Sequence, residues 1–348
     1  QTQIIKLFLN PLVKGDLGDY MKNFWQKLKK PILSMTPMAG ITDSAWRQIC
    51  KSWGADIVHT EFVSVDALYH GSTKTMQMLE YKASEQPVVV QIFGKNADLY
   101  PKAAQLVAKT GVAGIDINFG CPAKKVAGHG GGICLLRDMN SVKNIVSKTI
   151  EAVDIPVSVK TRISLRKIQG QPEAGDITVF DFIDALADLP IAALILHGRS
   201  YEVPFTGPVD LDMLKKAGQK FKEIFPDAPF LINGSFQTVE SVVEDLKYTK
   251  ADGIALSRAL YGRPWLFKQI KDYIATGEYQ EVNWATIKET AIKHANLLWE
   301  SKNDRAFVEM RKHLLFYVKG RPDATELRKQ LVRVENPDDV AKILKPLK

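Results

Sequence analysis

Short apolar runs that recur at regular intervals constrain the fold of this chain more than any other feature. Each run is rich in Val, Ile and Leu, and stretches with the 3.6-residue period of a helix separate the runs. Near-continuous apolar strands lie in a parallel sheet that helices cover on both faces, and eight such units close a barrel. The expected strands are 32–37, 56–61, 88–93, 114–118, 157–162, 193–197, 230–233 and 253–257. The helices expected between them are 44–53, 97–110, 141–153, 179–189, 211–225 and 238–249.

The pattern predicts an α/β fold, a (β/α)8 TIM barrel, followed by a small C-terminal all-α domain. A doubly wound open sheet is the alternative, but Pro37-Met-Ala-Gly40 stands where a dinucleotide-binding fold carries Gly-x-Gly-x-x-Gly after its first strand. After Trp265 only helical patterns follow, at 266–276, 284–302, 306–319 and 324–334. We therefore expect an N-terminal extension over 1–30, the barrel over 31–276 and the helical domain over 283–348.

Composition indicates a globular protein of a reducing compartment. The chain is 45% hydrophobic and 25% charged, which is ordinary for a soluble domain with a large core. Cys50, Cys121 and Cys134 have spacings that fit neither a disulfide framework nor a metal site. No apolar run reaches the ~20 residues of a membrane span. We expect a cytoplasmic monomer with no metal and no membrane partner.

Positive charge is concentrated near the C-terminal end. The formal net charge is +8, and residues 283–348 carry 14 Lys and Arg against 9 Asp and Glu. Most of the excess positive charge thus lies in the helical part. Some of its basic residues are close in sequence to the aromatic residues Phe316 and Tyr317. This asymmetry fits a surface that binds nucleic acid, and a solvated helical face is the alternative.

Polar side chains collect where the expected strands end. In a barrel, the carboxyl ends of the strands face the active-site mouth, so these residues should converge. Cys121 has a special context, because Gly120 and Pro122 end the strand and Lys124 and Lys125 follow. Such a thiol is a candidate nucleophile or proton donor, and a buried inert cysteine is the alternative. The converging residues are Met38, Glu61, Gln91, Asn118, Cys121, Lys160, Arg162, His197, Asn233 and Arg258.

The ends of the last two strands indicate a phosphate site. Asn233-Gly-Ser235 and Ser257-Arg258 close strands seven and eight, where barrels commonly hold a phosphate with backbone N–H groups and a cation. Asn-Gly-Ser alone is only a turn signal. Together with Arg258 at the end of the next strand, the motif favours a binding site for a cofactor phosphate.

Seven motifs together resemble those of the tRNA-dihydrouridine synthases, most closely the bacterial B-type branch. The resemblance runs from about Ile32 to Arg333, and Asn-x-Gly-Cys-Pro is its most specific element. The motifs are Pro37-Met-Ala-Gly-Ile-Thr-Asp43, Gln91-Ile-Phe-Gly94, Asn118-Phe-Gly-Cys-Pro122, Lys160-Thr-Arg162, His197-Gly-Arg199, Asn233-Gly-Ser235 and Gly262-Arg-Pro-Trp265.

The resemblance implies an FMN enzyme that takes hydride from NADPH, or NADH, and reduces the C5–C6 bond of particular uridines in tRNA. It makes Cys121 the proton donor to C5, and Asn118 and Arg162 the groups that hold the uracil. Residues implied for the flavin are Pro37, Met38 and Ala39 along it, Gln91 and Lys160 at its ring, His197 beside it, and Asn233, Gly234, Ser235, Ser257 and Arg258 at its phosphate.

Two positions depart from the family pattern, and two other functions remain open. Relatives usually carry Asn-Gly-Asp in place of Asn233-Gly-Ser235, and Gly-Arg in place of Ser257-Arg258. The first alternative function is another FMN barrel oxidoreductase, similar to dihydroorotate dehydrogenase, acting on a small pyrimidine. The second is a non-catalytic RNA-binding protein. The sequence leaves open which uridine is reduced and whether the RNA is ribosomal.

Overall fold

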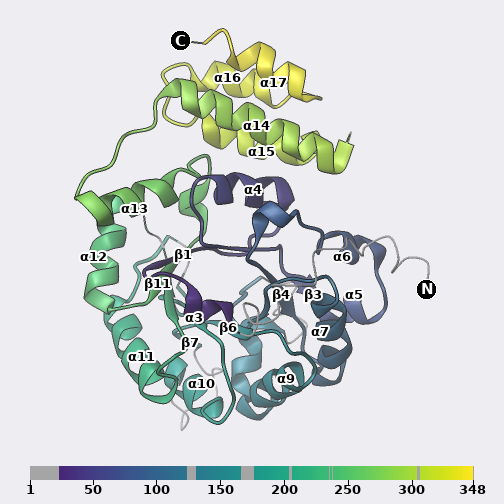
Figure 1. Cartoon of the computed structure of the whole chain (residues 1–348), viewed down its shortest axis with the longest axis vertical. Coiled ribbons are helices and arrows are strands. Elements are labelled where there is room, and N and C mark those ends of the chain that lie inside the picture. Colours follow the sequence, from purple (N-terminus) through teal and green to yellow (C-terminus); the bar gives the residue numbers. More distant parts are fainter. Residues whose placement is uncertain are drawn as a thin grey trace.

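Eight parallel strands form a closed barrel in the computed structural model, which describes residues 23–123, 131–165, 176–203, 206–234, 236, 238–303 and 306–347. Around the barrel the order is β2-β1-β11-β10-β9-β6-β5-β4, and β4 pairs back with β2. This confirms the predicted TIM barrel (Figure 1). The strands are β1 Ile32–Met35, β2 Ile57–His59, β4 Val88–Phe93, β5 Gly114–Asn118, β6 Val157–Arg162, β9 Leu194–His197, β10 Phe230–Asn233 and β11 Gly253–Leu256.

A layer of helices surrounds the strands. All six helices expected between strands are present, although the expected 97–110 helix divides into the 3-10 turn Ala97–Leu99 and an α-helix. Pro101 lies at the start of that α-helix, where its missing N–H costs no hydrogen bond. The layer consists of α4 Ser44–Ser52, α7 Tyr100–Ala108, α9 Met139–Glu151, α10 Val179–Ala185, α11 Leu211–Ile224, α12 Val239–Thr249 and α13 Leu266–Thr276.

Several short elements were not expected. Most of them are helices of about one turn or two-residue strands, which are too short to show a period in the sequence. They are α3 Phe24–Lys27, α5 Val65–Tyr69, α6 Thr73–Gln77, α17 Pro337–Leu344, the strands β3 Val63–Ser64, β7 Ser164–Leu165 and β8 Ile177–Thr178, and the 3-10 turns η1 Ala83–Glu85, η3 Gly132–Arg137 and η4 Arg258–Leu260.

The barrel interior changes from apolar to polar along the strands. Side chains alternate between the two faces of a strand, so residues two apart point the same way. Phe24 and Trp25 of α3 close the end where the strands begin, and they pack with Ile32, Val89 and Leu231 in one buried cluster. The next inward positions carry polar side chains, which the strand register aligns across β4, β5 and β6. Polar chemistry is therefore confined to the end where the strands finish.

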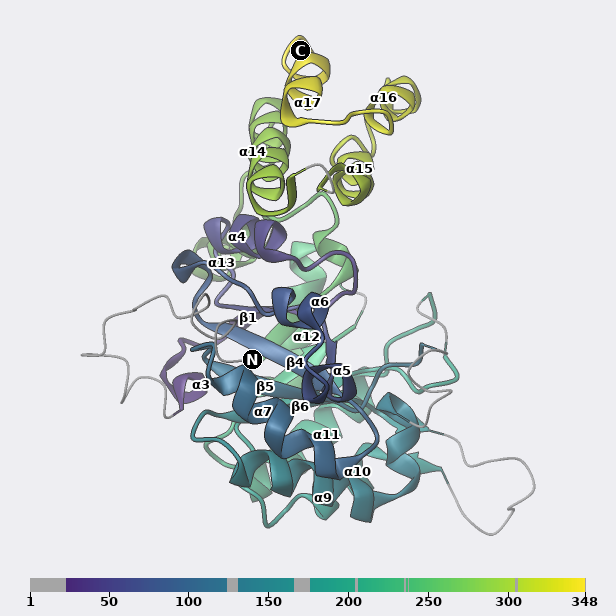
Figure 2. The ribbon, with the colours of Figure 1, turned by 90° about the vertical axis from the view of Figure 1, so that its right-hand side faces the viewer.

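Four further helices pack beside the barrel: α14 Trp284–Lys302, α15 Ala306–Tyr317, α16 Ala324–Leu331 and α17 Pro337–Leu344. Figure 2 shows them stacked above α4 and α13. Trp46 of α4 lies 5.2 Å, between ring centroids, from both His294 of α14 and His313 of α15. The helices thus share a continuous core with the barrel. Residues 1–22 of the expected extension lie outside the described residues.

Membrane insertion has no support among the helices that the structure describes, since none combines the length and the apolar character that a bilayer crossing requires.

Two buried histidines should make stability depend on pH. Burial holds the pKa of His313 down to about 4 and that of His294 well below its usual range, although Asp43 acts in the opposite direction. Below about pH 6.5 the two histidines therefore bind protons in the unfolded chain but stay neutral in the folded protein. We expect the free energy of unfolding to fall as the pH is lowered from 6.5 towards 4. The His313→Asn protein should lose about 1.4 kcal/mol less per pH unit in urea unfolding. The exposed His70 gives the control His70→Asn; an equal slope in all three proteins would contradict this prediction.

Candidate active site

A cavity of about 310 Å³ opens where the barrel strands end. It gathers twelve of the fourteen residues that the sequence predicts to be catalytic, cofactor-binding or substrate-binding, Gly234 among them. Ala39 is exposed and is not part of the lining, and Ser235 lies outside the described residues. The lining consists of Thr36, Pro37, Met38, Phe62, Gln91, Asn118, Gly120, Cys121, Pro122, Lys160, Arg162, His197, Asn233, Gly234, Ser257, Arg258 and Tyr261.

Cys121 stands just past the end of β5, in a turn that its neighbours hold. Asn118 Oδ1 accepts the backbone N–H groups of Gly120 at 3.0 Å and of Cys121 at 2.8 Å. Arg162 Nε donates to the carbonyl oxygen of Gly120 at 3.0 Å. A Cβ on Gly120 would lie 3.2 Å from the backbone carbon of Thr161, so the close approach of the turn to β6 favours glycine. The turn therefore presents the thiol at a fixed place.

The thiol of Cys121 is kept protonated. Burial raises its pKa, and this outweighs the backbone N–H of Ala123 and the cations Lys160 and Arg162, which act in the opposite direction. The sequence had placed Lys124 and Lys125 beside the thiol, but both lie outside the described residues. A protonated thiol near two cations can give up its proton, because the cations stabilise the thiolate that remains.

Lys160 and Arg162 project from alternate positions of β6 into the cavity. Burial and the nearby Arg162 lower the pKa of Lys160 to about 8, while Asp116 and Cys121 raise it. Arg162 also donates through Nη1 to the carbonyl oxygen of Ser200 at 2.9 Å. Two guanidinium N–H groups of Arg162 thus hold the backbone after two strands in place. Arg162 therefore has a structural role as well as lining the cavity.

His197 is neutral. Burial, followed by Lys160, Arg162, Arg199 and Arg258, lowers its pKa to about 2. Its Nε2 lies 3.3 Å from Nη1 of Arg199. A guanidinium only donates, so Nε2 must accept and the ring proton sits on Nδ1. Arg199 itself is anchored through Nε to the carbonyl oxygen of Gly207 at 2.7 Å.

The ends of β10 and β11 form a second polar group. Asn233 Nδ2 donates to the carbonyl oxygen of Ala255 at 2.6 Å and to Ser257 Oγ at 3.1 Å. The Ser257 side chain is thus tied to its neighbouring strand. Arg258 opens η4 beside it, and the Gly234 backbone completes this side of the cavity.

This chemistry suits an anionic, aromatic cofactor. Lys160, Arg162 and Arg258 supply positive charge, the Gly234 backbone can approach closely, and Met38, Phe62 and Tyr261 give apolar walls. Among the residues with a described position, no group of three His, Cys, Asp or Glu could hold a metal ion.

The Tyr261 region joins the cavity to α15 and was not identified as a site from the sequence. The rings of Tyr261 and Phe316 stack with centroids 4.5 Å apart. Gly262 has φ of 67°, and a Cβ there would lie 2.4 Å from the backbone carbon of Phe316. Lys312 of α15 donates to the carbonyl oxygen of Gly40 at 2.9 Å. Phe62 was also missed, and the available signal for it was an aromatic residue directly after the predicted strand 56–61.

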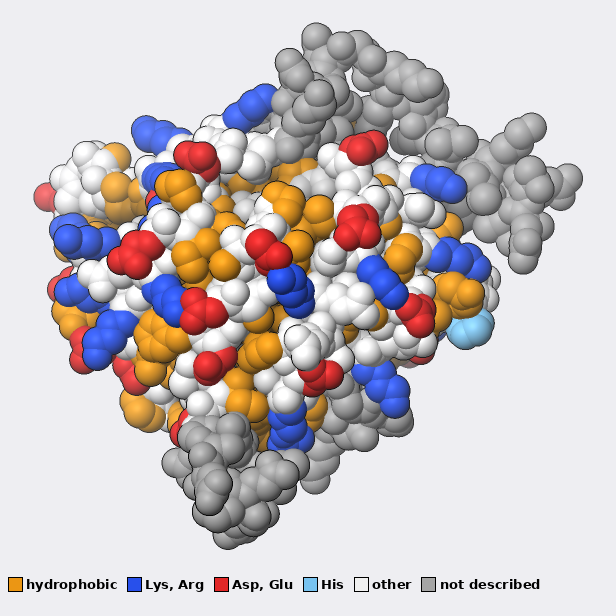
Figure 3. All heavy atoms as spheres, turned by 90° about the horizontal axis from the view of Figure 1, so that it is seen from below, with side chains coloured by type: hydrophobic (Ala, Val, Ile, Leu, Met, Phe, Trp, Pro, Cys, Tyr) orange, Lys and Arg blue, Asp and Glu red, His pale blue; other side chains and the backbone are white. Residues whose placement is uncertain are grey.

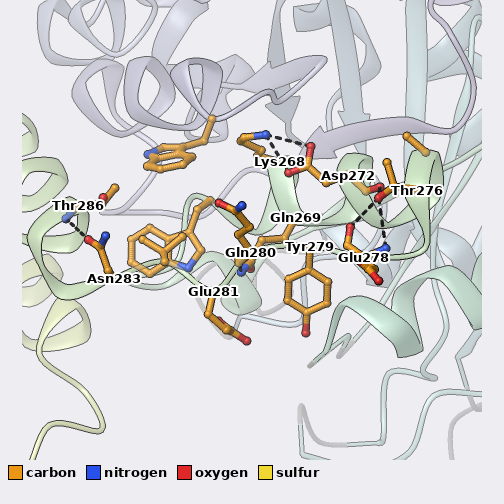
Figure 4. Close-up of a pocket in the computed structure, with 14 residues that line it drawn as sticks. Lys268, Gln269, Asp272, Thr276, Glu278, Tyr279, Gln280, Glu281, Asn283 and Thr286 are labelled. Atoms are coloured by element: carbon orange, nitrogen blue, oxygen red, sulfur yellow. Dashed lines mark hydrogen bonds and ion pairs between the residues drawn. The ribbon is translucent and has the colours of Figure 1, made fainter.

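A larger hollow, of about 650 Å³, lies elsewhere, between α13 and the start of α14 (Figure 4). Its polar side chains bond mainly to one another or to nearby backbone: Lys268 pairs with Asp272 at 2.8 Å, and Thr276 Oγ1 donates to the carbonyl oxygen of Glu278 at 3.0 Å. It contains none of the strand-end residues. Catalytic chemistry is therefore assigned to the smaller cavity.

A protein family and several of its members match most of this chain. The family model described as "Dihydrouridine synthase (Dus)" matches residues 34–347. "Probable tRNA-dihydrouridine synthase 1" of Synechocystis sp. is 33% identical over 86% of this chain and 82% of that protein. "tRNA-dihydrouridine synthase B" of Xanthomonas axonopodis pv. citri is 30% identical over 88% of this chain and 90% of that protein. The protein of the same name from Pseudomonas aeruginosa is 31% identical over 88% and 89%.

Solved structures share the barrel at much lower identity. A histamine dehydrogenase from Rhizobium sp. 4-9 superposes with a TM-score of 0.51 and 13% identity, over 76% of this chain and 48% of that one. A 2-naphthoyl-CoA reductase gives a TM-score of 0.51 and 10% identity, over 69% of this chain and 50% of that one. This chain spans about half the length of each. At such identities the likeness concerns the fold alone.

Proposed function

The chain belongs to the dihydrouridine synthase family, and from that premise we propose that it reduces the C5–C6 double bond of particular uridines in tRNA to 5,6-dihydrouridine. FMN is the proposed bound cofactor, and NADPH or NADH the proposed hydride donor. The names of the relatives at about 30% identity support the reaction. The single observation that carries the proposal is the protonated Cys121 thiol in a cavity that also holds Asn118, Lys160 and Arg162.

The residues of this cavity fit FMN. Arg258 with the Gly234 backbone would hold the phosphate, and Gln91 and Lys160 would bond the ring system, with Pro37, Met38 and His197 beside it. Bound FMN would supply the hydride that adds to C6 of the uracil. A cation such as Lys160 beside the ring stabilises negative charge there, which is a main way for a protein to tune a flavin. Ser257 Oγ already accepts from Asn233, so its own proton is available to a phosphate oxygen.

Cys121 supplies the proton to C5, the other carbon of the double bond. Its Sγ–H bond breaks and the proton forms the new C–H bond at C5, while the electron pair stays on sulfur. Lys160 and Arg162 stabilise that thiolate until water returns a proton to it. A positioned general acid of this kind contributes typically ~10²–10⁴-fold to a rate.

The RNA must bring one base out of its stack to reach such a cavity. Extruding a base costs a few kcal/mol, which contacts to the phosphate backbone can offset. The basic surplus on residues 283–348 is the proposed source of those contacts. A reductase for a small free pyrimidine would have no use for it, and a protein that only binds RNA would have no use for the Cys121 turn.

The proposed function is tested with purified full-length protein, NADPH and tRNA from cells that lack dihydrouridine. We expect a yellow protein that releases FMN on denaturation, and dihydrouridine in the nucleoside digest by mass spectrometry. A colourless protein that forms none, even with added FMN, would contradict the proposal. Free uridine and ribosomal RNA are the substrate controls.

Arg258→Ala should weaken FMN binding while the fold stays intact. The substitution removes a charge-assisted phosphate contact at the strand end, so we expect a loss of about tenfold in affinity. FMN titration of the flavin-free protein gives the measurement. Arg263→Ala is the matched control, because Arg263 is exposed and lies outside the lining. Equal affinities for both variants would place the phosphate elsewhere.

A further inference from the structure

We propose that Asp116 is a positioning residue that fixes the orientation of the Gln91 and Asn118 amides. Through them it restricts the cavity to hydrogen-bond acceptors at two points and holds the Cys121 turn. The inference rests on the proposed function for its link to flavin and uracil, but the chain of hydrogen bonds can be examined without either.

The strand register brings these residues together. Gln91 of β4 lies opposite Asp116 of β5, and Asp116 lies opposite Ser158 of β6. All three side chains point into the barrel. Gln91 lines the cavity, whereas Asp116 and Ser158 are not among its lining residues. Asp116 is fully buried. Its Oδ2 accepts from Gln91 Nε2 at 2.6 Å, and its Oδ1 accepts from Ser158 Oγ at 2.8 Å.

The bonds continue upward to the thiol. Gln91 Oε1 accepts from Asn118 Nδ2 at 2.7 Å. Asn118 Oδ1 accepts the backbone N–H groups of Gly120 and Cys121. A carboxylate on the floor of the site is therefore linked, through two amides, to the turn that presents the thiol.

The direction of these bonds is determined from both ends. An ionised carboxylate only accepts, so Gln91 must turn its nitrogen towards Asp116 and its oxygen towards Asn118. Backbone N–H groups only donate, so Asn118 must turn its oxygen towards Cys121 and its nitrogen towards Gln91. Both requirements give the same orientation, and reversing either amide would set two donors or two acceptors against each other. Burial raises the pKa of Asp116 to about 6, while the hydrogen bonds from Gln91 and Ser158 and the nearby Lys160 favour the charged carboxylate.

A consequence follows for ligand recognition. Asn118 Oδ1 already accepts two N–H groups, and Gln91 Oε1 accepts one. No described residue accepts the second N–H of either amide, and both side chains line the cavity. At these two points the site therefore offers donors and selects carbonyl oxygens or unprotonated ring nitrogens. Flavin and uracil rings both carry such acceptors.

The first test compares three variants by FMN titration of the flavin-free protein. Asp116→Ala removes the acceptor, frees the Gln91 amide and should weaken FMN binding about ten- to a hundredfold. Asp116→Asn should restore most of the affinity, since its oxygen can accept from Gln91 while its nitrogen donates to Ser158. Ser158→Ala is the control, because it removes the other partner of Asp116 without touching Gln91. Normal affinity in Asp116→Ala, or an equal loss in Ser158→Ala, would overturn the proposal.

The second test needs neither flavin nor RNA. Iodoacetamide alkylation of Cys121, located by peptide mass spectrometry, reports how firmly the turn is held. We expect about fivefold faster alkylation in Asp116→Ala, the factor that corresponds to about one hydrogen bond, and the wild-type rate in Asp116→Asn. If Asp116→Ala does not fold, Gln91→Met interrupts the same bonds one step later and should accelerate alkylation equally. An unchanged rate overturns the proposal. If the wild-type protein binds no FMN but the variants show the expected alkylation rates, the proposed function is refuted and the positioning role of Asp116 is not.

Discussion

The Cys121→Ala protein should fold, bind FMN and accept hydride from NADPH at a nearly normal rate, yet reduce tRNA ~10²–10⁴-fold more slowly. The two half-reactions separate because flavin reduction requires no proton at C5 of a uracil. In the proposed reaction, only the step that forms the C5–H bond needs the thiol. Single-turnover mixing of the reduced enzyme with tRNA, followed by flavin absorbance, gives the rate.

Cys134→Ala is the matched control for this variant. Cys134 lies in η3 and is half-buried like Cys121, but it does not line the cavity. Its Sγ is 3.9 Å from Nη1 of Arg137, which is at most a weak contact. If Cys134→Ala lost tRNA reduction and Cys121→Ala kept it, the acid would have been assigned to the wrong cysteine.

The same residue predicts a pH effect with a definite sign. Because burial raises the pKa of Cys121 above the usual ~8.5, the thiol stays protonated through neutral pH. The rate of tRNA reduction should therefore fall only above that usual value, as the acid form is lost. The residual rate of Cys121→Ala should lack this decline. A decline of the same shape in both proteins would assign it to another group.

The barrel could be predicted from the sequence because its strands are apolar runs, most of them with a polar side chain in their second half. Gln91, Asn118 and Lys160 were predicted to line the cavity because they lie in the second half of their strands, which leads to the mouth of a barrel. Asp116 was missed for the opposite reason. It lies in the middle of a strand, and only its spacing of two from Asn118 shows that it points into the barrel.

Contacts between distant segments could not be predicted. Nothing in the sequence pairs Phe316 with Tyr261. The helical part was expected as a separate unit, yet His294 and His313 are buried against Trp46 of the barrel layer. Removing residues 283–348 would expose this surface, so a truncated barrel is a poor probe of RNA binding. Substitutions on the exposed side are more informative, and the division into barrel and tRNA-binding domain remains a prediction.

Three exposed basic residues of the helical part should contribute to tRNA affinity. Lys319 follows α15, Lys329 belongs to α16 and Arg333 follows it, and all three are exposed. In Figure 2, α15 and α16 lie towards the right of α14 and α17, on the side of the barrel opposite α3. Since α3 closes the end where the strands begin, this is the side of the mouth. Replacing all three residues by Ala should weaken tRNA binding about a hundredfold, counting roughly 1 kcal/mol for each lost phosphate contact.

Salt dependence distinguishes phosphate contacts from a general loss of stability. Each phosphate contact contributes nearly one unit to the slope of log affinity against log salt concentration, so the slope of the triple variant should be smaller by about three.

A control triple variant replaces exposed lysines at the barrel helices, Lys109, Lys216 and Lys247. On the barrel face drawn in Figure 3, Lys and Arg alternate with Asp and Glu, so a nucleic acid finds no continuous basic surface there. We expect the control to retain both the affinity and the slope, because its net charge changes equally but its lysines lie away from α15 and α16. Equal losses in the two triple variants would mean that tRNA responds to net charge alone, and the assignment of the C-terminal helices to RNA binding would then be wrong.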